Sequence, residues 1–167
     1  MDTTDIQKWF ALYTKPKSEK KIFSELTESG IEAYLPLRKE LRLWSDRKKW
    51  IDVPIISSYI FVRVSQLEYR KVFEVKNIVG YVSYKGKAVV IPDMEMEIMK
   101  RAVENKLEFS VEKGKLQKGK KIKFTSGPFM GLSGEITEIK GVKKLYLRIK
   151  NVGFTLIANI DDQFLSD

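Results

Sequence analysis

Residues 125–136, TSGPFMGLSGEI, contain three glycines and a proline within a chain otherwise rich in lysine and β-branched residues. Strand-like runs precede and follow this segment. Glycine permits positive φ angles and close approach of neighbouring backbones, so the segment predicts a sharp turn between two strands of a small, strongly bent sheet. Pro128 stiffens the turn. Phe129 lies at its tip, where the ring either packs back on the sheet or contacts a partner.

The residues after this turn continue the strand pattern. KLYLRIK at 144–150 and GFTLIANI at 153–160 alternate apolar side chains with other residues, as expected of half-buried strands. Several short strands joined by glycine-rich turns predict a small twisted β-barrel over residues 119–167. Residues 106–118 lose this periodicity and gain lysine and glycine, so they are predicted to be a linker.

Residues 1–105 read as a mixture of strands and helices, which makes the fold class α+β. KWFALYT at 8–14 and SYIFVRV at 58–64 carry large apolar side chains on both faces, as central strands do. Residues 16–30 have the apolar spacing of an amphipathic helix that ends at Gly30. Two strands over 41–53 surround a polar turn, which predicts a hairpin.

Two further helices are predicted in this half. Ser65 and Glu68 have the spacing of a capping box, so a helix is expected over 65–76 that buries Leu67, Val72 and Phe73. Asp93 is placed to cap a helix that follows it.

Charge and residue usage restrict the functional classes. The chain has 31 Lys plus Arg against 22 Asp plus Glu, a net charge of +9, which favours a polyanionic partner such as nucleic acid. Cysteine and histidine are absent, which removes the usual nucleophile–base pairs and zinc ligands. Residues 114–121, GKLQKGKK, resemble a phosphate loop, but Lys121 stands where Ser or Thr is needed. We therefore expect no enzyme, no catalytic set, no metal site and no cofactor.

Aromatic and basic residues are the candidate binding groups. If Ile60 and Val62 point into the core, Tyr59 and Phe61 share the other face of their strand with Tyr13. That face is either an exposed aromatic patch or is covered by the protein's own helices. Lysines and arginines crowd the first strand–helix junction and the hairpin at 38–49, where they could neutralise phosphates.

These segments together resemble the NusG family of transcription elongation factors. The resemblance rests on WFALYT, EKKIFSEL, GIEAYLP, SYIFVRV and VGYVSYKGKAVVIP, followed by KGKKIKFTSGPFMGLSGEI, in the family's order. Its most specific parts are the Trp9 strand, the Tyr59–Val62 strand and the Gly-Pro-Phe plus Gly134 signature of a KOW domain. Within the family the chain looks most similar to the specialised antiterminators RfaH and the UpxY-type regulators of capsular polysaccharide operons.

The resemblance implies a domain organisation and two classes of partner. It implies an NGN domain over 1–105, an antiparallel sheet flanked by helices that binds the clamp helices of bacterial RNA polymerase. The linker would cover 106–118, and 119–167 would be an SH3-like KOW barrel. Such a factor promotes read-through of terminators at specific operons.

The resemblance also implies roles for individual residues. Tyr13, Tyr59 and Phe61 match polymerase-binding aromatics, and Arg70 and Lys71 fall near the family's second polymerase contact at the gate loop. The positions that match contacts to non-template DNA are Lys15, Ser18 and Lys21. Phe129 matches a KOW residue that helps to contact Rho or a small-subunit ribosomal protein.

Some positions depart from the family pattern, and a second function stays open. Ser57 and Ser58 replace the usual Pro-Gly or Pro-Asn before the tyrosine, and YRKVF at 69–73 replaces the threonine-rich gate-loop motif of RfaH. The other partners implied are non-template DNA or a nascent RNA leader. The alternative function is an RNA- or ribosome-binding module that acts through the barrel. Without an apolar run long enough to span a membrane, a cytoplasmic protein is expected.

Overall fold

A computed structural model describes residues 6–107, 109–113, 119–124, 129–139, 141–149 and 154–160. The chain forms two compact units, Met1–Val82 and Ser83–Asp167, which are described separately below. The division between them therefore comes before the predicted linker. That linker is also partly structured, because β10 (Phe109–Lys113) lies within it and pairs with another strand.

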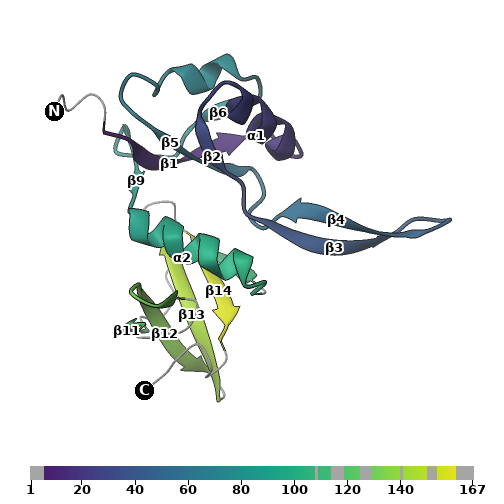
Figure 1. Cartoon of the computed structure of the whole chain (residues 1–167), viewed down its shortest axis with the longest axis vertical. Helices are drawn as coiled ribbons and strands as arrows, with labels where there is room; N and C mark the ends of the chain where they lie inside the picture. The colour runs from purple at the N-terminus through teal and green to yellow at the C-terminus, as the bar shows by residue number, and fades with distance from the viewer. Residues whose placement is uncertain are drawn as a thin grey trace. The chain divides into compact units, whose positions relative to one another are not determined.

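The first unit is built on an antiparallel sheet in the strand order β2-β5-β1-β6 (Figure 1). Its strands are β1 (Lys8–Thr14), β2 (Glu32–Tyr34), β5 (Tyr59–Val64) and β6 (Ile78–Tyr81). β1 and β5 pair from Lys8 opposite Val64 to Tyr13 opposite Tyr59. Both are central strands, as their sequences predicted, because each has a partner on either side.

The helix predicted near residue 20 is confirmed as α1 (Glu19–Glu28). Its apolar stripe buries Ile22 and Leu26, and Gly30 follows with a φ of +82°, a conformation that glycine adopts without strain. An isolated helix of this length is only marginally stable in water, so burial of the apolar stripe supplies most of the stability of α1.

The helix predicted over 65–76 is wrong. The capping-box bonds form, with the Ser65 N–H donating to Glu68 Oε2 at 2.9 Å, but the chain continues as turns and a short 3-10 helix, η2 (Lys71–Glu74). Val72 is buried as expected, whereas Leu67 and Phe73 are exposed. The physical reason is that the Tyr69 ring stacks on Tyr81, and this tertiary contact prevails over a weak local helix signal.

A two-stranded hairpin extends from the sheet of the first unit (Figure 1). It consists of β3 (Leu37–Leu43) and β4 (Lys48–Pro54), paired antiparallel along their full length. Two backbone hydrogen bonds join Trp44 and Arg47, so the loop at the tip is Ser45-Asp46. The hairpin predicted from sequence is confirmed.

The second unit contains the helix α2 (Asp93–Glu104) and a five-stranded antiparallel sheet in the order β10-β14-β13-β12-β11. Three short strands precede the helix: β7 (Ser83–Tyr84), β8 (Lys87–Ala88) and β9 (Val90–Ile91). The other sheet strands are β11 (Lys120–Lys123), β12 (Ser133–Ile139), β13 (Val142–Ile149) and β14 (Phe154–Asn159). The strands predicted in this region are therefore present.

Two glycines of residues 125–136 have separate structural functions. Gly131 has a φ of +85° in the turn before β12. A Cβ on Gly134 would lie 2.8 Å from Phe124 Cε2 and 3.2 Å from Leu145 Cδ1, so this position accepts no side chain without movement of the core. Gly127 and Pro128 lie outside the described residues.

Candidate functional site

Two tyrosines form a pair at one end of the β1–β5 ladder. Tyr13 is directly opposite Tyr59, and their ring centroids are 4.9 Å apart at an interplanar angle of 52°. Tyr13 is 38% exposed, and Tyr59 is half-buried. The predicted aromatic surface is therefore present at these two positions.

The ionisation of Tyr59 is suppressed. Burial raises the pKa of Tyr59, and the hydrogen bond and charge interaction with Tyr13 raise it further. The Tyr59 hydroxyl group therefore remains neutral over the physiological pH range, and the pair offers aromatic area with a polar edge.

Phe61 does not belong to this surface. Its side chain lies on the same strand face as Tyr59, but it is 0% exposed. Phe61 is at the centre of β5, between Ala11 of β1 and Tyr34 of β2, whereas Tyr59 begins the strand. Because the middle of a central strand is covered and its end is open, the expected three-ring patch is corrected to the pair Tyr13–Tyr59.

A buried carboxylate holds the chain entering β5. Glu19 is 4% exposed, and its Oε1 accepts a 2.7 Å hydrogen bond from the Ser58 N–H. The Ser58 carbonyl in turn accepts a 2.9 Å bond from Thr14 N–H, next to Tyr13. Ser58 has a φ of +65°, the left-handed conformation that glycine and asparagine adopt most readily. Sequence reasoning missed Glu19, because nothing in a charged helix start shows that one carboxylate turns inward.

The predicted nucleic-acid residues lie close to this pair in the chain. Lys15 and Lys21 are exposed and Ser18 is half-buried; all three are in the β1–α1 junction or the first turn of α1. Ser18 is the N-cap residue of α1, and Lys21 is 3.9 Å from Glu25 in an exposed ion pair. The junction thus presents exposed cations beside Thr14 and Tyr13.

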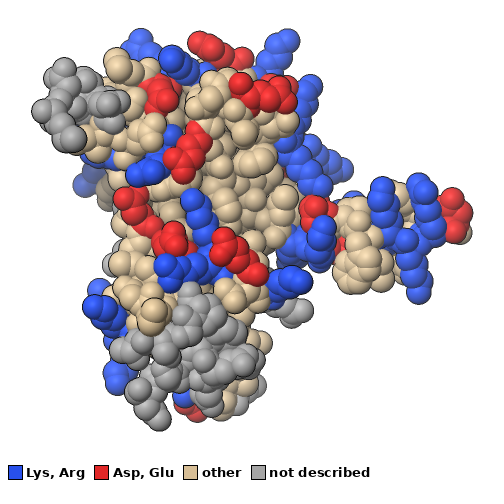
Figure 2. Space-filling model, viewed as in Figure 1, with Lys and Arg blue, Asp and Glu red and all other residues tan. Residues whose placement is uncertain are grey.

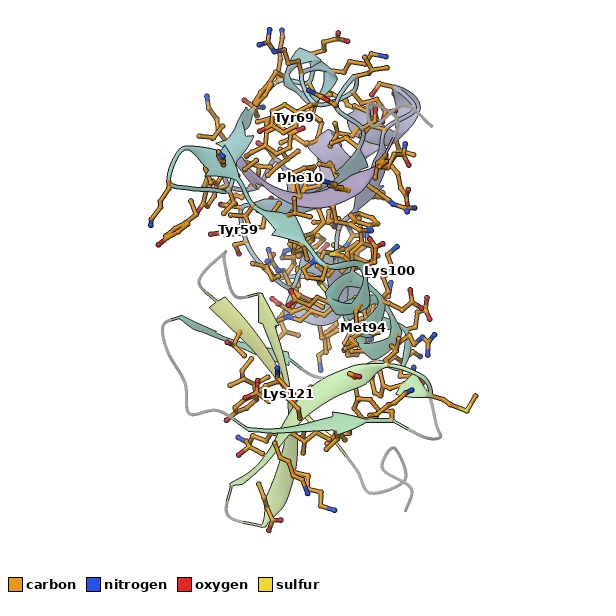
Figure 3. The ribbon with its side chains drawn as sticks, turned by 90° about the vertical axis from the view of Figure 1, so that its left-hand side faces the viewer. Phe10, Tyr59, Tyr69, Met94, Lys100 and Lys121 are labelled. Carbon is orange, nitrogen blue, oxygen red and sulfur yellow. The ribbon has the colours of Figure 1, made fainter. Side chains whose placement is uncertain are left out.

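Arg70 and Lys71 are exposed at the start of η2, over a different region of the sheet. Beneath that region lies an aromatic cluster on the sheet face opposite Tyr59 (Figure 3). Its members are Phe10, Tyr69, Phe73 and Tyr81. Tyr69 and Tyr81 stack with centroids 4.0 Å apart, and Tyr81 donates a 2.7 Å hydrogen bond to the Tyr69 carbonyl. The structure therefore separates these two cations from the tyrosine pair.

Phe129 is a core residue of the second unit. It is 0% exposed, and its ring centroid is 5.2 Å from that of Phe124. Of the two orientations open from the sequence, the structure has the ring packed back. The prediction that Phe129 contacts a partner is corrected accordingly: the ring instead stabilises the turn before β12 by burial.

Residues 7–100 match a known protein family over more than half of the chain. The family is described as "Transcription termination factor nusG". The chain belongs to the NusG family. The match includes the Tyr13–Tyr59 pair and the β3–β4 hairpin. It stops before the five-stranded sheet of the second unit.

One solved structure similar to this NusG-family chain is described as "Domain interaction in Thermotoga maritima NusG". The two are 22% identical, with a TM-score of 0.49, and the alignment covers 90% of this chain and 92% of that one. No curated protein matches the chain.

Membership makes this chain a NusG-family transcription factor, in a family that regulates elongation and antitermination. Within the described residues, no helix is long and apolar enough to cross a membrane. The same part of the chain contains no cluster of three or more metal-ligating side chains.

Proposed function

We propose that this factor binds the clamp helices of bacterial RNA polymerase through the Tyr13–Tyr59 pair and promotes read-through of terminators. The observation that carries the proposal is the pair itself: two tyrosine rings in contact on one face of the sheet, one of them exposed, held at the open end of the sheet. Such rings supply large contact area with little loss of side-chain entropy, as residues that dominate protein interfaces do. Family membership supplies the class of partner.

The mechanism follows from differential binding. A factor that binds the elongating conformation of polymerase better than the paused one shifts the population toward elongation. The chain needs no catalytic group for this effect. Glu19 contributes by holding Ser58, and therefore Tyr59, in a fixed backbone position.

We further propose that the chain is recruited to particular operons. In this scheme the chain is an RfaH-like or UpxY-type specialised factor that acts at operons such as capsular or surface polysaccharide clusters. Lys15, Ser18 and Lys21 contact non-template DNA or a nascent RNA leader. Arg70 and Lys71 contribute a second polymerase contact, through exposed charge.

We also propose a role for each of the two domains. Residues 1–105 act as the NGN domain, and 119–167 act as an SH3-like KOW barrel that recruits Rho or a small-subunit ribosomal protein. The antiparallel pairing of β11 to β14 within these residues, extended by β10 from the predicted linker, is compatible with such a barrel. Because Phe129 is buried, its ring maintains the barrel and the partner contacts come from other residues.

The test is terminator read-through by the cognate RNA polymerase in a purified system. The informative variant is Tyr13→Ala combined with Tyr59→Ala. Tyr84→Ala is the matched control, because Tyr84 is 63% exposed and lies outside the pair. We expect the wild type and the control to raise read-through, and the double variant to lose the effect while keeping its circular dichroism spectrum.

Two results would contradict the proposal. One is equal read-through by the folded double variant and the wild type. The other is absence of polymerase binding by the wild type, which would favour the RNA- or ribosome-binding alternative.

A further inference from the structure

The β3–β4 hairpin has two chemically different faces. In an antiparallel pair, residues directly opposite one another point to the same side. Arg42 is opposite Lys49, and Leu41 is opposite Trp50. Trp44 and Arg47 flank the turn and share the face of Arg42. One face, which we name the Trp44 face, therefore consists near the tip of Trp44, Arg47, Arg42 and Lys49.

The opposite face, here the Trp50 face, is mostly apolar near the tip. Leu41, Leu43 and Trp50 are 42%, 68% and 63% exposed, and Lys48 lies among them. Farther from the tip, Lys39 pairs with Asp52 at 2.8 Å, which neutralises that charge.

The cations of the Trp44 face are only partly neutralised. Glu40 is the acidic residue of this face, and it lies 3.6 Å from Arg38 and 3.5 Å from Arg42. Among the described residues, no salt bridge joins Arg47 or Lys49 to a carboxylate. Lys and Arg side chains cover much of the projecting arm (Figure 2). The face thus carries positive charge that is available to an anion.

Trp44 adds a flat apolar surface among these charges. It is 47% exposed, and the Arg47 guanidinium carbon lies 5.6 Å from its ring centroid. Side chains two residues apart on a strand are about 6.6 Å apart, so Arg42 lies one such step from Trp44. An indole between cations is the combination on which single-stranded nucleic acids are bound: bases stack on the ring, and cations contact the phosphates.

We propose that the Trp44 face of the hairpin binds an unpaired nucleic-acid strand, with a base stacked on Trp44 and phosphates held by Arg47 and Lys49. Duplexes bind more weakly, because their bases are already stacked on one another. Arg47 and Lys49 contact phosphates, which RNA and DNA share. The Glu40 carboxylate is paired with Arg38 and Arg42, so it does not bind the 2′-hydroxyl of RNA. RNA and DNA strands therefore bind with similar affinity. This site is separate from the tyrosine pair and from the junction at Lys15.

The experiment measures fluorescence anisotropy of labelled oligonucleotides with the full chain and no polymerase. The probes are oligo(dT) and oligo(rU) of about twelve nucleotides and a DNA duplex of equal length. Trp44→Ala is compared with Trp50→Ala, the same substitution on the opposite face. We expect Trp44→Ala to weaken single-strand binding about 5- to 150-fold, the range for loss of one stacked base. Trp50→Ala should change it less than about twofold, because no base stacks there.

The charge term has its own matched pair. Lys49→Gln and Lys48→Gln remove the same charge from neighbouring residues on opposite faces. Lys49→Gln should reduce the slope of log affinity against log salt by about 0.7, the value for one phosphate contact on a single strand. Lys48→Gln should leave that slope unchanged.

Three results would overturn the proposal: no oligonucleotide binding, equal effects of the two tryptophan substitutions, or tighter binding of the duplex. Circular dichroism of each variant checks the fold, and the lysine pair remains informative if either tryptophan variant unfolds. Because the assay contains no polymerase, its failure is distinguishable from failure of the read-through test.

Discussion

Replacing Phe61 with alanine separates a core role from a binding role at the centre of β5. Phe61 is fully buried at the centre of β5, so truncation removes transfer free energy and leaves a cavity on that face of the sheet. Buried Phe→Ala changes cost about 3 to 5 kcal/mol in free energy of unfolding. A unit the size of Met1–Val82 has a total stability of only about 4 to 12 kcal/mol. Phe61→Ala should therefore remove a large part of it.

The neighbouring position provides the contrast. Tyr59 lies on the same strand face, but it is half-buried at the end of the strand. Its contact with the Tyr13 ring contributes about 0.5 to 1.5 kcal/mol to the free energy of unfolding, beyond the effect of its buried area. Tyr59→Ala should cost roughly 1 to 2 kcal/mol on that basis. Phe61→Leu nearly conserves the volume of the side chain and should cost less than about 1.5 kcal/mol.

The assays are urea unfolding and thermal unfolding of the full chain, each monitored by far-ultraviolet circular dichroism and tryptophan fluorescence. Since about 1 kcal/mol shifts the melting temperature of a small domain by 4 to 8 °C, Phe61→Ala should lower it by on the order of 20 °C. Equal losses for Phe61→Ala and Tyr59→Ala, or a loss below about 1 kcal/mol for Phe61→Ala, would refute the assignment of Phe61 to the core. Any loss of polymerase binding by a destabilised Phe61→Ala variant has to be interpreted as unfolding.

Three further predictions concern stability. Gly134→Ala should lower the free energy of unfolding by about 1 to 3 kcal/mol through overpacking, whereas Gly80→Ala, with no atom within 4 Å of the new Cβ, should be neutral. Thermal unfolding compares the two variants, and equal effects would disprove the packing argument. Glu19→Ala leaves a backbone N–H without its acceptor and should cost about 1 to 3 kcal/mol in urea unfolding, and Glu19→Gln less, so a larger loss for Gln would contradict this. The backbone hydrogen bond from Ser65 lowers the pKa of Glu68 below its ordinary 4.5. The ionised Glu68 therefore stabilises the fold above about pH 4.5, and this stabilisation is lost as pH falls through the folded pKa. The difference in free energy of unfolding between wild type and Glu68→Gln should shrink in acid. A difference that grew in acid would contradict the downward direction of the Glu68 pKa shift.

The spacing of apolar residues along the sequence predicted those helices and strands whose formation depends mainly on neighbouring residues. The strand at β1 and the helix α1 followed from apolar spacing, and the alternation around Leu145 predicted strand β13. The helix expected over 65–76 failed because its outcome depends on a distant aromatic ring, Tyr81, which no local window includes. Likewise, β10 was read as linker, because its strand character comes from pairing with β14.

The candidate site shows the same limit. Sequence could place Tyr59 and Phe61 on one face, since strand residues two apart share a side. It could not say that the middle of β5 is covered and its end open, because cover comes from other elements. Glu19 is the sharper case: charge favours solvent exposure, and only the fold reveals the backbone N–H that compensates for burial.

That buried carboxylate also accounts for a departure from the family pattern. The family resemblance implies glycine or asparagine at the position of Ser58, and both adopt a positive φ readily, whereas other residues incur about 1 to 2 kcal/mol. Ser58 has a φ of +65° nonetheless. A hydrogen bond from an N–H to a charged acceptor contributes about 1.5 to 3 kcal/mol, so the Glu19 contact can offset the strain. Serine at this position is therefore compatible with the backbone turn that presents Tyr59. The hydrogen bond from Ser58 to Glu19 of α1 stabilises the positive φ that glycine would adopt without strain.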